Sequence, residues 1–282
     1  MHIDIDGHTQ YAYTGGKTWL AHQPVVVLIH GVLNDHSVWI LQSRHLAHHG
    51  YNVLALDLPG HGRSQGLCPP TVAAASHAVL AWLDALAVPQ AALVGHSWGS
   101  LIALHTAATA PERVHHLGLV GTASPMRVSP ALLQRSQQAP LEAIEMVNSF
   151  SHSTWAPGPS ALGPGTWVPG ASRALMRHLL RNSPDAALFH TGFSACDRYD
   201  EAQTRMAQVR CPVGFVLGLH DQMTPPKAAA GLQAVAQATG LDVQTTVLNA
   251  GHSLMTEAPD GTRDALMALL ARPAPASSPA SH

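Results

Sequence analysis

Short apolar runs alternate with longer amphipathic stretches along most of this chain. The runs are rich in Val, Leu and Ala and typical of buried strands, and they lie at residues 25–29, 51–56, 91–94, 117–120, 213–218 and 243–248. Between the second and third runs, apolar side chains recur at helical spacing, at Val72, Ala75, Val79, Leu83 and Leu86. Strands that alternate with helices predict an α/β fold with a doubly wound, mostly parallel sheet, and ligands of such sheets bind outside the carboxyl ends of the strands.

The same pattern divides the chain into a core in two halves, an insertion and a tail. Residues 3–13 alternate around Gly7 and predict an N-terminal hairpin, which makes 117–120 the sixth strand. A helical cap is predicted after that strand, before the run at 213–218 opens the second half of the core. The predicted parts are the first half, the cap or lid, the second half and a disordered tail, at residues 1–123, 124–209, 210–271 and 272–282 in that order.

The predicted cap combines helix-like pieces with stretches rich in proline and glycine. The helix-like pieces lie at 131–150, 171–182 and 185–195, and the irregular stretches at 155–159 and 163–165. Such stretches are typical of either a flexible lid or a rigid irregular wall. The sequence leaves both alternatives open.

The pentapeptide Gly95-His96-Ser97-Trp98-Gly99 carries the strongest chemical signal. It follows the apolar run 91–94 and precedes a helix-like stretch, which predicts a strand, a sharp turn and a helix. Glycine on both sides removes the Cβ atoms that would crowd such a turn, and the helix N-terminus places the serine hydroxyl in a positive field. Ser97 is therefore predicted to be a nucleophile whose oxyanion intermediate is stabilised there.

A serine needs a base, and the base needs an orienting acid. Asp221 follows the strand-like run 213–218, and His252 follows the run 243–248. Both would lie at carboxyl ends of strands, at the same edge of the sheet as Ser97. The order Ser97, Asp221, His252 predicts a catalytic triad, with Asp57 as the other candidate acid.

On these residues the chain resembles the α/β-hydrolase superfamily, in the branch of small serine esterases that carry a cap. The resemblance covers about residues 3–271 and rests on four motifs: the pentapeptide around Ser97, His30-Gly31, the stretch Asp57-Leu58-Pro59-Gly60-His61-Gly62-Arg63-Ser64, and Gly251-His252. It implies that the amides of Val32 and Trp98 form the oxyanion hole. It also assigns Asp57 to a structural loop.

Several departures narrow the activity that the resemblance implies. Haloalkane dehalogenases and epoxide hydrolases carry aspartate where this chain has Ser97. The loop Gly31-Val32-Leu33-Asn34 lacks the Gly-Gly-Pro-Gly loop of proline iminopeptidases and the Gly-Gly-Gly loop of lipases. No acid follows the run 117–120, where some relatives place their triad carboxylate, so Asp221 has no rival there.

Composition excludes other classes of function. The chain has 282 residues, 46% of them hydrophobic, and a formal charge of −2 without a basic run, so we expect no nucleic-acid partner. It has no signal-peptide pattern and no apolar run near the roughly 20 residues of a membrane span, so the cytosol is the expected compartment. The odd set Cys68, Cys196 and Cys211 indicates reduced thiols.

Twenty histidines raise the question of a metal site. His45 and His49 lie four residues apart, a spacing that could hold zinc, but no carboxylate or cysteine joins them. A solvated helix face explains them better. We expect neither a metal nor a cofactor.

The sequence predicts a carboxylesterase-like serine hydrolase that cleaves small or medium, mostly apolar acyl esters through an acyl-enzyme. Alternatives with the same triad are a lactonase, a thioesterase, a C–C bond hydrolase and a cofactor-free perhydrolase, and a ligand receptor with vestigial hydrolysis is an alternative of another class. The oligomeric state stays open. Apolar candidates for the substrate pocket, each of which could equally belong to the core, are Trp39, Met126, Trp155 and Met223.

The predicted cap also carries a stripe of cations. Arg173, Arg177 and Arg181 recur every four residues, on one side of a helix. The stripe is either an ordinary solvated face or a surface for an acidic partner such as acyl carrier protein, as in the arginine-bearing caps of pimeloyl-carrier-protein methyl esterases. A nearly neutral chain without a wider basic field favours the solvated face.

Overall fold

A single eight-stranded sheet organises the protein, which is described here from a computed structural model over residues 1–155 and 167–274. The order of the strands in the sheet is β1-β2-β4-β3-β5-β6-β7-β8. β1 pairs with β2, and β2 with β4, in antiparallel orientation. All other neighbouring strands, from β4 through β3 to β8, are parallel. The bounds are His2–Ile5 (β1), His8–Tyr13 (β2), Val25–Ile29 (β3), Asn52–Asp57 (β4), Ala91–His96 (β5), Val114–Val120 (β6), Val213–Gly218 (β7) and Val243–Leu248 (β8). The predicted α/β class with a doubly wound, mostly parallel sheet is confirmed.

The central strands are buried on both faces, which explains their continuous apolar sequences. In β3, every residue is buried, and alternate side chains enter two different hydrophobic clusters: Val25, Val27 and Ile29 one, Val26 and Leu28 the other. Every residue of β4, β5 and β7 is buried as well. By contrast β8 lies at the edge and pairs with β7 alone, and its side chains are half-buried or exposed.

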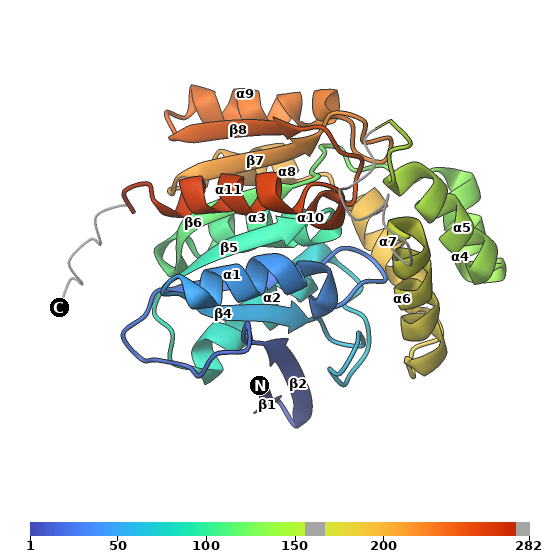
Figure 1. Ribbon diagram of the computed structural model, residues 1–282, viewed down its shortest axis with the longest axis horizontal. Helices are drawn as coiled ribbons and strands as arrows, with labels where there is room; N and C mark the ends of the chain where they lie inside the picture. Colours follow the sequence, from blue (N-terminus) through green and yellow to red (C-terminus); the bar gives the residue numbers. More distant parts are fainter. Residues whose placement is uncertain (156–166, 275–282) are drawn as a thin grey trace.

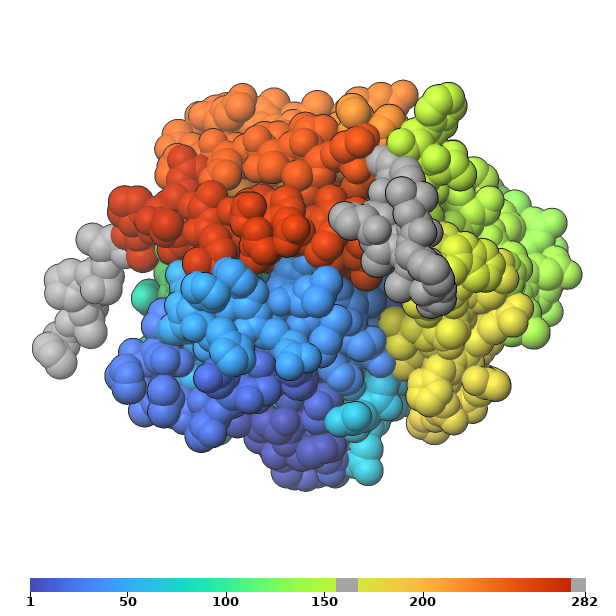
Figure 2. All heavy atoms as spheres, viewed as in Figure 1, coloured from blue at the N-terminus to red at the C-terminus, as the bar shows by residue number. Residues whose placement is uncertain are grey.

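Helices cover both faces of this sheet (Figure 1). On one face lie α1 (Ile40–His48), preceded by the short helix η1 (His36–Trp39), and α11 (Pro259–Leu270), and these two long helices contact each other directly (Figure 2). On the other face lie α2 (Val72–Ala85), α3 (Trp98–Thr109), α8 (Ala202–Met206) and α9 (Ala230–Ala238). Three short helices complete the core, at Pro111–Arg113 (η2), Pro226–Ala229 (η4) and Leu254–Glu257 (α10).

Four helices gather beyond the carboxyl ends of the strands, as Figure 1 shows. They are α4 (Pro130–Gln138), α5 (Pro140–Ser151), α6 (Val168–Asn182) and α7 (Leu188–Arg198), and they follow β6 in the chain. α4 contacts α5 and α7, and α5 contacts α6. α8 follows them in sequence but packs against α3 and α9 in the core.

Some predicted features lie outside the described residues. These are all of the stretch 163–165, the stretch 155–159 beyond Trp155, and the tail beyond residue 274. Within residues 1–155 and 167–274, no helix has both the length and the apolar character needed to cross a membrane.

Candidate active site

Ser97 occupies a strained turn between β5 and α3. Its backbone has φ 55° and ψ −120°, a conformation that residues with a side chain rarely adopt. A Cβ atom on Gly95 would overlap the carbonyl of Gly99, and one on Gly99 would overlap the carbonyl of Ile29. Only glycine therefore fits at positions 95 and 99, and these two glycines allow the tight elbow that the sequence predicted.

Asp221 and His252 form a buried pair at the same edge of the sheet. Asp221 follows β7 closely, His252 lies in the loop after β8, and Oδ2 of Asp221 is 2.8 Å from Nδ1 of His252. The contact places the proton of a neutral His252 on Nδ1, which leaves Nε2 free to accept a proton. Burial opposes the charge of Asp221, but His252 and hydrogen bonds from Thr224 outweigh it and lower the pKa of the carboxyl to about 2.

Thr224, three residues after Asp221, also belongs to this network. Its backbone amide donates to Oδ1 of Asp221 at 2.8 Å, and its hydroxyl donates to Oδ2 at 2.7 Å. The same hydroxyl oxygen lies 3.0 Å from Nδ1 of His252. Thr224 therefore orients the carboxylate and touches the imidazole, and no spacing rule in the sequence could have identified it.

His96 holds the other side of the histidine loop. Its Nε2 donates to the backbone carbonyl of His252 at 2.9 Å, which connects β5 directly to the loop after β8. Burial and the neighbouring His252 lower the pKa of His96 to about 3, so its ring stays neutral. His96 directly precedes Ser97 in the pentapeptide, whereas its hydrogen-bond partner is 156 positions away in the chain.

The end of α5 is also tied to the histidine loop. The amide of His252 donates to the carbonyl of Ser151 at 2.8 Å. The buried carboxylate of Glu257 accepts from the amide of Ser153 at 2.7 Å and from that of Gly251 at 3.1 Å. Burial raises the pKa of Glu257, with hydrogen bonds from the amides opposing that shift. Residues 151–153 thus contact the backbone on both sides of His252.

The two residues proposed for the oxyanion hole flank Ser97. Trp98 is the first residue of α3, directly after Ser97, and its side chain is fully buried. Val32 follows β3, in a loop so close to the elbow that a Cβ on Gly31 would lie 3.2 Å from the Cβ of Ser97. Both amides therefore belong to backbone that adjoins the serine.

Two cavities meet at Ser97. The larger, about 320 Å³, is lined by Ser97, Val32 and His252 and by apolar side chains from α1, α5 and α6. The smaller, about 250 Å³, is lined by Ser97 and by side chains from the loop after β6, α4, α5 and the loop after β7. Phe193 of α7 and Met223 contribute to both cavities.

The four predicted pocket residues differ in their positions. Met223 lines both cavities and Met126 lines the smaller one. Trp39 is fully buried in the hydrophobic cluster on the α1 side of the sheet and lines neither cavity, because η1 turns its ring toward the core. The side chain of Trp155 is 84% exposed and lines neither of these two cavities.

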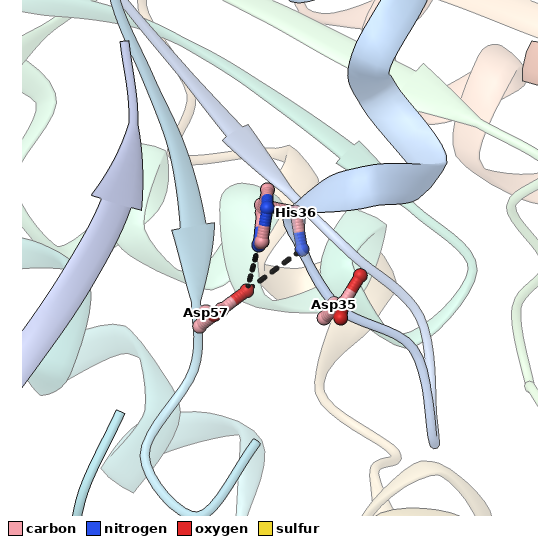
Figure 3. Close-up of side chains that lie close together, drawn as sticks. All are labelled: Asp35, His36 and Asp57. Carbon is pink, nitrogen blue, oxygen red and sulfur yellow. Dashed lines mark hydrogen bonds and ion pairs between the residues drawn. The ribbon is translucent and has the colours of Figure 1, made fainter. Parts of the chain in front are cut away.

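Asp57 is the last residue of β4, which several strands separate from β8 and the histidine loop. Its Oδ1 accepts from the amide of His36 at 2.8 Å and contacts the ring Nδ1 at 2.7 Å, as Figure 3 shows. Its Oδ2 accepts from the amide of Arg63 at 2.9 Å. Burial opposes the charge, but the interactions with His36 and Arg63 prevail and lower the pKa of Asp57. These bonds support a structural role in the loops after β3 and β4.

The same corner contains a group that could in principle hold a metal ion. Potential ligand atoms of Asp35, His36 and Asp57 lie within 4.8 Å of one another, and it is the one such group within the described ranges. Asp35 already accepts from the amide and hydroxyl of Ser37, as an N-cap of η1. Hydrogen bonds within the chain therefore account for the cluster. His45 and His49 stack with ring centroids 3.8 Å apart on the surface of α1.

The three cysteines are buried free thiols. Burial raises the pKa of Cys68 and of Cys211 to about 12 and that of Cys196 still further. A thiol with so high a pKa carries almost no thiolate at neutral pH and is a poor nucleophile. Ser97 is the nucleophile that the geometry favours.

Comparisons with known proteins agree with this architecture. The family described as alpha/beta hydrolase fold matches residues 24–160. The dihydrolipoyllysine-residue acetyltransferase component of the acetoin cleaving system of Pseudomonas putida is 41% identical over 99 residues, which are 35% of this chain and 26% of that protein. The chain matches only 23% to 30% of the length of this protein and two further curated relatives.

Other similarities extend over nearly the whole chain. A pimeloyl-[acyl-carrier protein] methyl ester esterase of Xanthomonas axonopodis pv. citri is 28% identical over 280 residues, covering 96% of this chain and 99% of that protein. The enol-lactonase from Burkholderia xenovorans LB400 has the same fold, with a TM-score of 0.82 at 20% identity over 96% of this chain and 100% of that one. Together with the doubly wound sheet, these similarities show that the chain has the α/β-hydrolase fold, and its residues 24–160 match the family of that description.

Proposed function

We propose that the protein is a serine hydrolase that cleaves esters of small or medium, mostly apolar acyl groups through an acyl-enzyme. One observation carries the proposal: His252, held by the buried carboxylate of Asp221, lines the same cavity as Ser97 on its strained elbow. This combination supplies a nucleophile, a base and an orienting acid. The apolar lining of both cavities favours an uncharged substrate.

In the proposed reaction, Oγ of Ser97 attacks the carbonyl carbon and gives its proton to Nε2 of His252. Asp221 stabilises the imidazolium, and the amides of Val32 and Trp98 stabilise the oxyanion. The tetrahedral intermediate expels the alcohol, which takes the proton from His252. Water, activated by the same histidine, then hydrolyses the acyl-enzyme and regenerates Ser97.

The same residues would also serve a lactonase, a thioesterase, a C–C bond hydrolase or a cofactor-free perhydrolase, so the bond type is part of the proposal. Related proteins include the enol-lactonase and the pimeloyl-[acyl-carrier protein] methyl ester esterase described above. A carrier-protein substrate would call for free cations on the outer surface. Arg173 and Arg177 both pair with the single carboxylate of Glu145, however, which offsets one of the three positive charges in the stripe, and the chain as a whole has a formal charge of −2. A small free ester is therefore the favoured substrate.

Replacement of the nucleophile tests the proposal. Ser97→Ala should abolish labelling by a fluorophosphonate probe and lower turnover of p-nitrophenyl esters by several orders of magnitude, because only the oxyanion hole and substrate binding remain. The fold should survive the loss of one hydroxyl. Ester turnover near the wild-type level in a pure, equally stable Ser97→Ala protein would reject the assignment.

A further inference from the structure

The smaller of the two cavities at Ser97 ends in a largely apolar wall. Seven of its lining side chains are apolar and come from five parts of the fold: Met126, Val128, Leu132, Met146, Phe150, Phe193 and Met223. Its one charged lining residue, Arg127, is exposed and donates to the carbonyl of Asp197. An aliphatic group fits this lining, whereas an anion or a sugar would lose its hydration without recovering enough hydrogen bonds.

The two cavities differ in their access to the catalytic groups. Ser97 lines both, but His252 and Val32 line only the larger cavity. A leaving alcohol must lie beside the imidazole that returns its proton. The acyl chain has no such requirement, because it only extends from the carbonyl carbon that Ser97 attacks.

We infer that the smaller cavity binds the aliphatic acyl chain of the substrate and that the larger cavity binds the leaving alcohol. The inference rests on the proposed function and adds a division of the site that the triad alone does not determine. A volume of about 250 Å³ suits a small or medium chain, since pockets for drug-sized ligands begin at roughly 300 Å³. Met126, Met146 and Met223 are unbranched and adaptable, so the wall can follow chains of different length.

Helix α5 provides a matched pair of positions for a test. Met146 lines only the smaller cavity, and its neighbour Val147 lines only the larger one. Both side chains are half-buried in the same helix, so tryptophan at either position disturbs the helix to a similar degree while it fills a different cavity. Neither residue belongs to the triad or to the oxyanion hole.

The first experiment measures kcat/KM for two ester series with wild type, Met146→Trp and Val147→Trp. One series varies the acyl chain of p-nitrophenyl esters from acetate to octanoate, and the other varies the alcohol of butyrate esters from methanol to hexanol. Met146→Trp should lower the ratio of kcat/KM for octanoate to that for acetate by about tenfold or more, because a few methylenes in a pocket are worth at least that factor. In the same variant, the dependence of kcat/KM on the length of the alcohol should stay as in wild type. Val147→Trp should do the reverse. The division would be overturned if Met146→Trp changed the alcohol dependence and Val147→Trp the acyl dependence, or if both variants affected both series equally.

A binding measurement separates this inference from the proposed reaction. A neutral ketone, 2-nonanone, carries a heptyl chain on its carbonyl and a methyl group in place of the alcohol, and its binding to each protein needs no turnover. Met146→Trp should weaken its binding about tenfold, and Val147→Trp should leave binding nearly unchanged. Ketone binding that follows this pattern in a protein without esterase activity would reject the hydrolase and keep the division. Ketone binding that Val147→Trp weakens and Met146→Trp does not would reject the division, whatever the activity.

Discussion

At the scale of single residues, Thr224 and His96 hold the Asp221–His252 pair from two sides, one through the carboxylate and the other through the backbone of His252. Ser97, Asp221 and His252 stood out because each follows a strand-like run, and the structure brings Asp221 and His252 within 2.8 Å. Thr224 and His96 were not recognisable in this way. Their partners are distant in the chain or depend on the conformation of a loop, and no periodic pattern encodes either. Trp39 lies in a hydrophobic cluster of the core, and the sequence alone does not distinguish a core ring from a pocket ring.

The choice of acid is testable at this scale. Asp221→Asn should lower kcat by roughly four orders of magnitude, because an amide at this position favours the wrong tautomer of His252. With its pKa at about 2, the native carboxylate stays charged at all ordinary pH values, so its own titration should not appear in the pH profile of kcat/KM. Steady-state kinetics of ester turnover, measured for Asp221→Asn and, over a range of pH, for wild type, check these two expectations.

Asp57→Asn is the matched control. It removes a buried carboxylate of the same type, at a site bonded to His36 and Arg63. We expect lower thermal stability and nearly normal kcat/KM in the folded fraction. Loss of catalysis in a folded Asp57→Asn protein, with Asp221→Asn still active, would reverse the two roles.

At the scale of elements, the apolar strands could be predicted from the sequence. Their bounds were missed where a strand contains polar residues. β6 begins at Val114, three residues before the predicted run, because His115 and His116 continue the strand. The ring Nε2 of His116 is buried against the carbonyl of Arg272, which a pattern of apolar letters cannot indicate. The helical cap predicted at 124–209 stays a prediction, and the packing of α8 (Ala202–Met206) against α3 and α9 places that helix in the core. That contact is tertiary and has no local signal.

The tie between α5 and the histidine loop leads to a prediction for Glu257. Glu257→Gln replaces one acceptor oxygen by an amide group, which cannot accept from the amide of Ser153 or Gly251. The histidine loop should shift, and we expect kcat to fall about tenfold to a hundredfold with little change in KM, since a small misplacement of a catalytic group has this cost. Kinetics well below the melting temperature separate this loss from unfolding.

Asp260→Asn provides the control from the neighbouring helix. Its carboxylate is exposed and pairs with Arg263, a type of interaction that contributes little. Its kinetics should match wild type. Normal kcat in Glu257→Gln would show that the carboxylate stabilises the loop without positioning His252.

At the scale of the whole molecule, twenty histidines in a nearly neutral chain make the fold sensitive to acid. The sequence drew attention to their number but not to their burial. Burial, with the charges of neighbouring histidines, lowers the pKa of His30 and His96 to about 3 and that of His115 to about 4. These rings are neutral in the folded protein and take up protons on unfolding at mildly acid pH.

The sign of this effect follows from proton linkage. Between pH 6.5 and 4, the unfolded chain binds more protons than the folded one, so the free energy of unfolding must fall as pH falls. Each such histidine contributes a slope of up to about 1.4 kcal/mol per pH unit in that range. Asp57 and Asp221 have lowered pKa values, and they add their own loss only as pH falls below about 4.

Urea unfolding at pH 7, 6, 5 and 4.5 should therefore show a steep loss of stability well above the range in which carboxylates titrate. His115→Gln removes one half-buried imidazole and should make the slope shallower by about one proton, because glutamine has no proton to take up on unfolding. His22→Gln changes an exposed ring and should leave the slope as in wild type. A free energy of unfolding that stays constant from pH 7 to 4.5, or one whose slope responds equally to both substitutions, would contradict the assignment of acid sensitivity to the buried histidines.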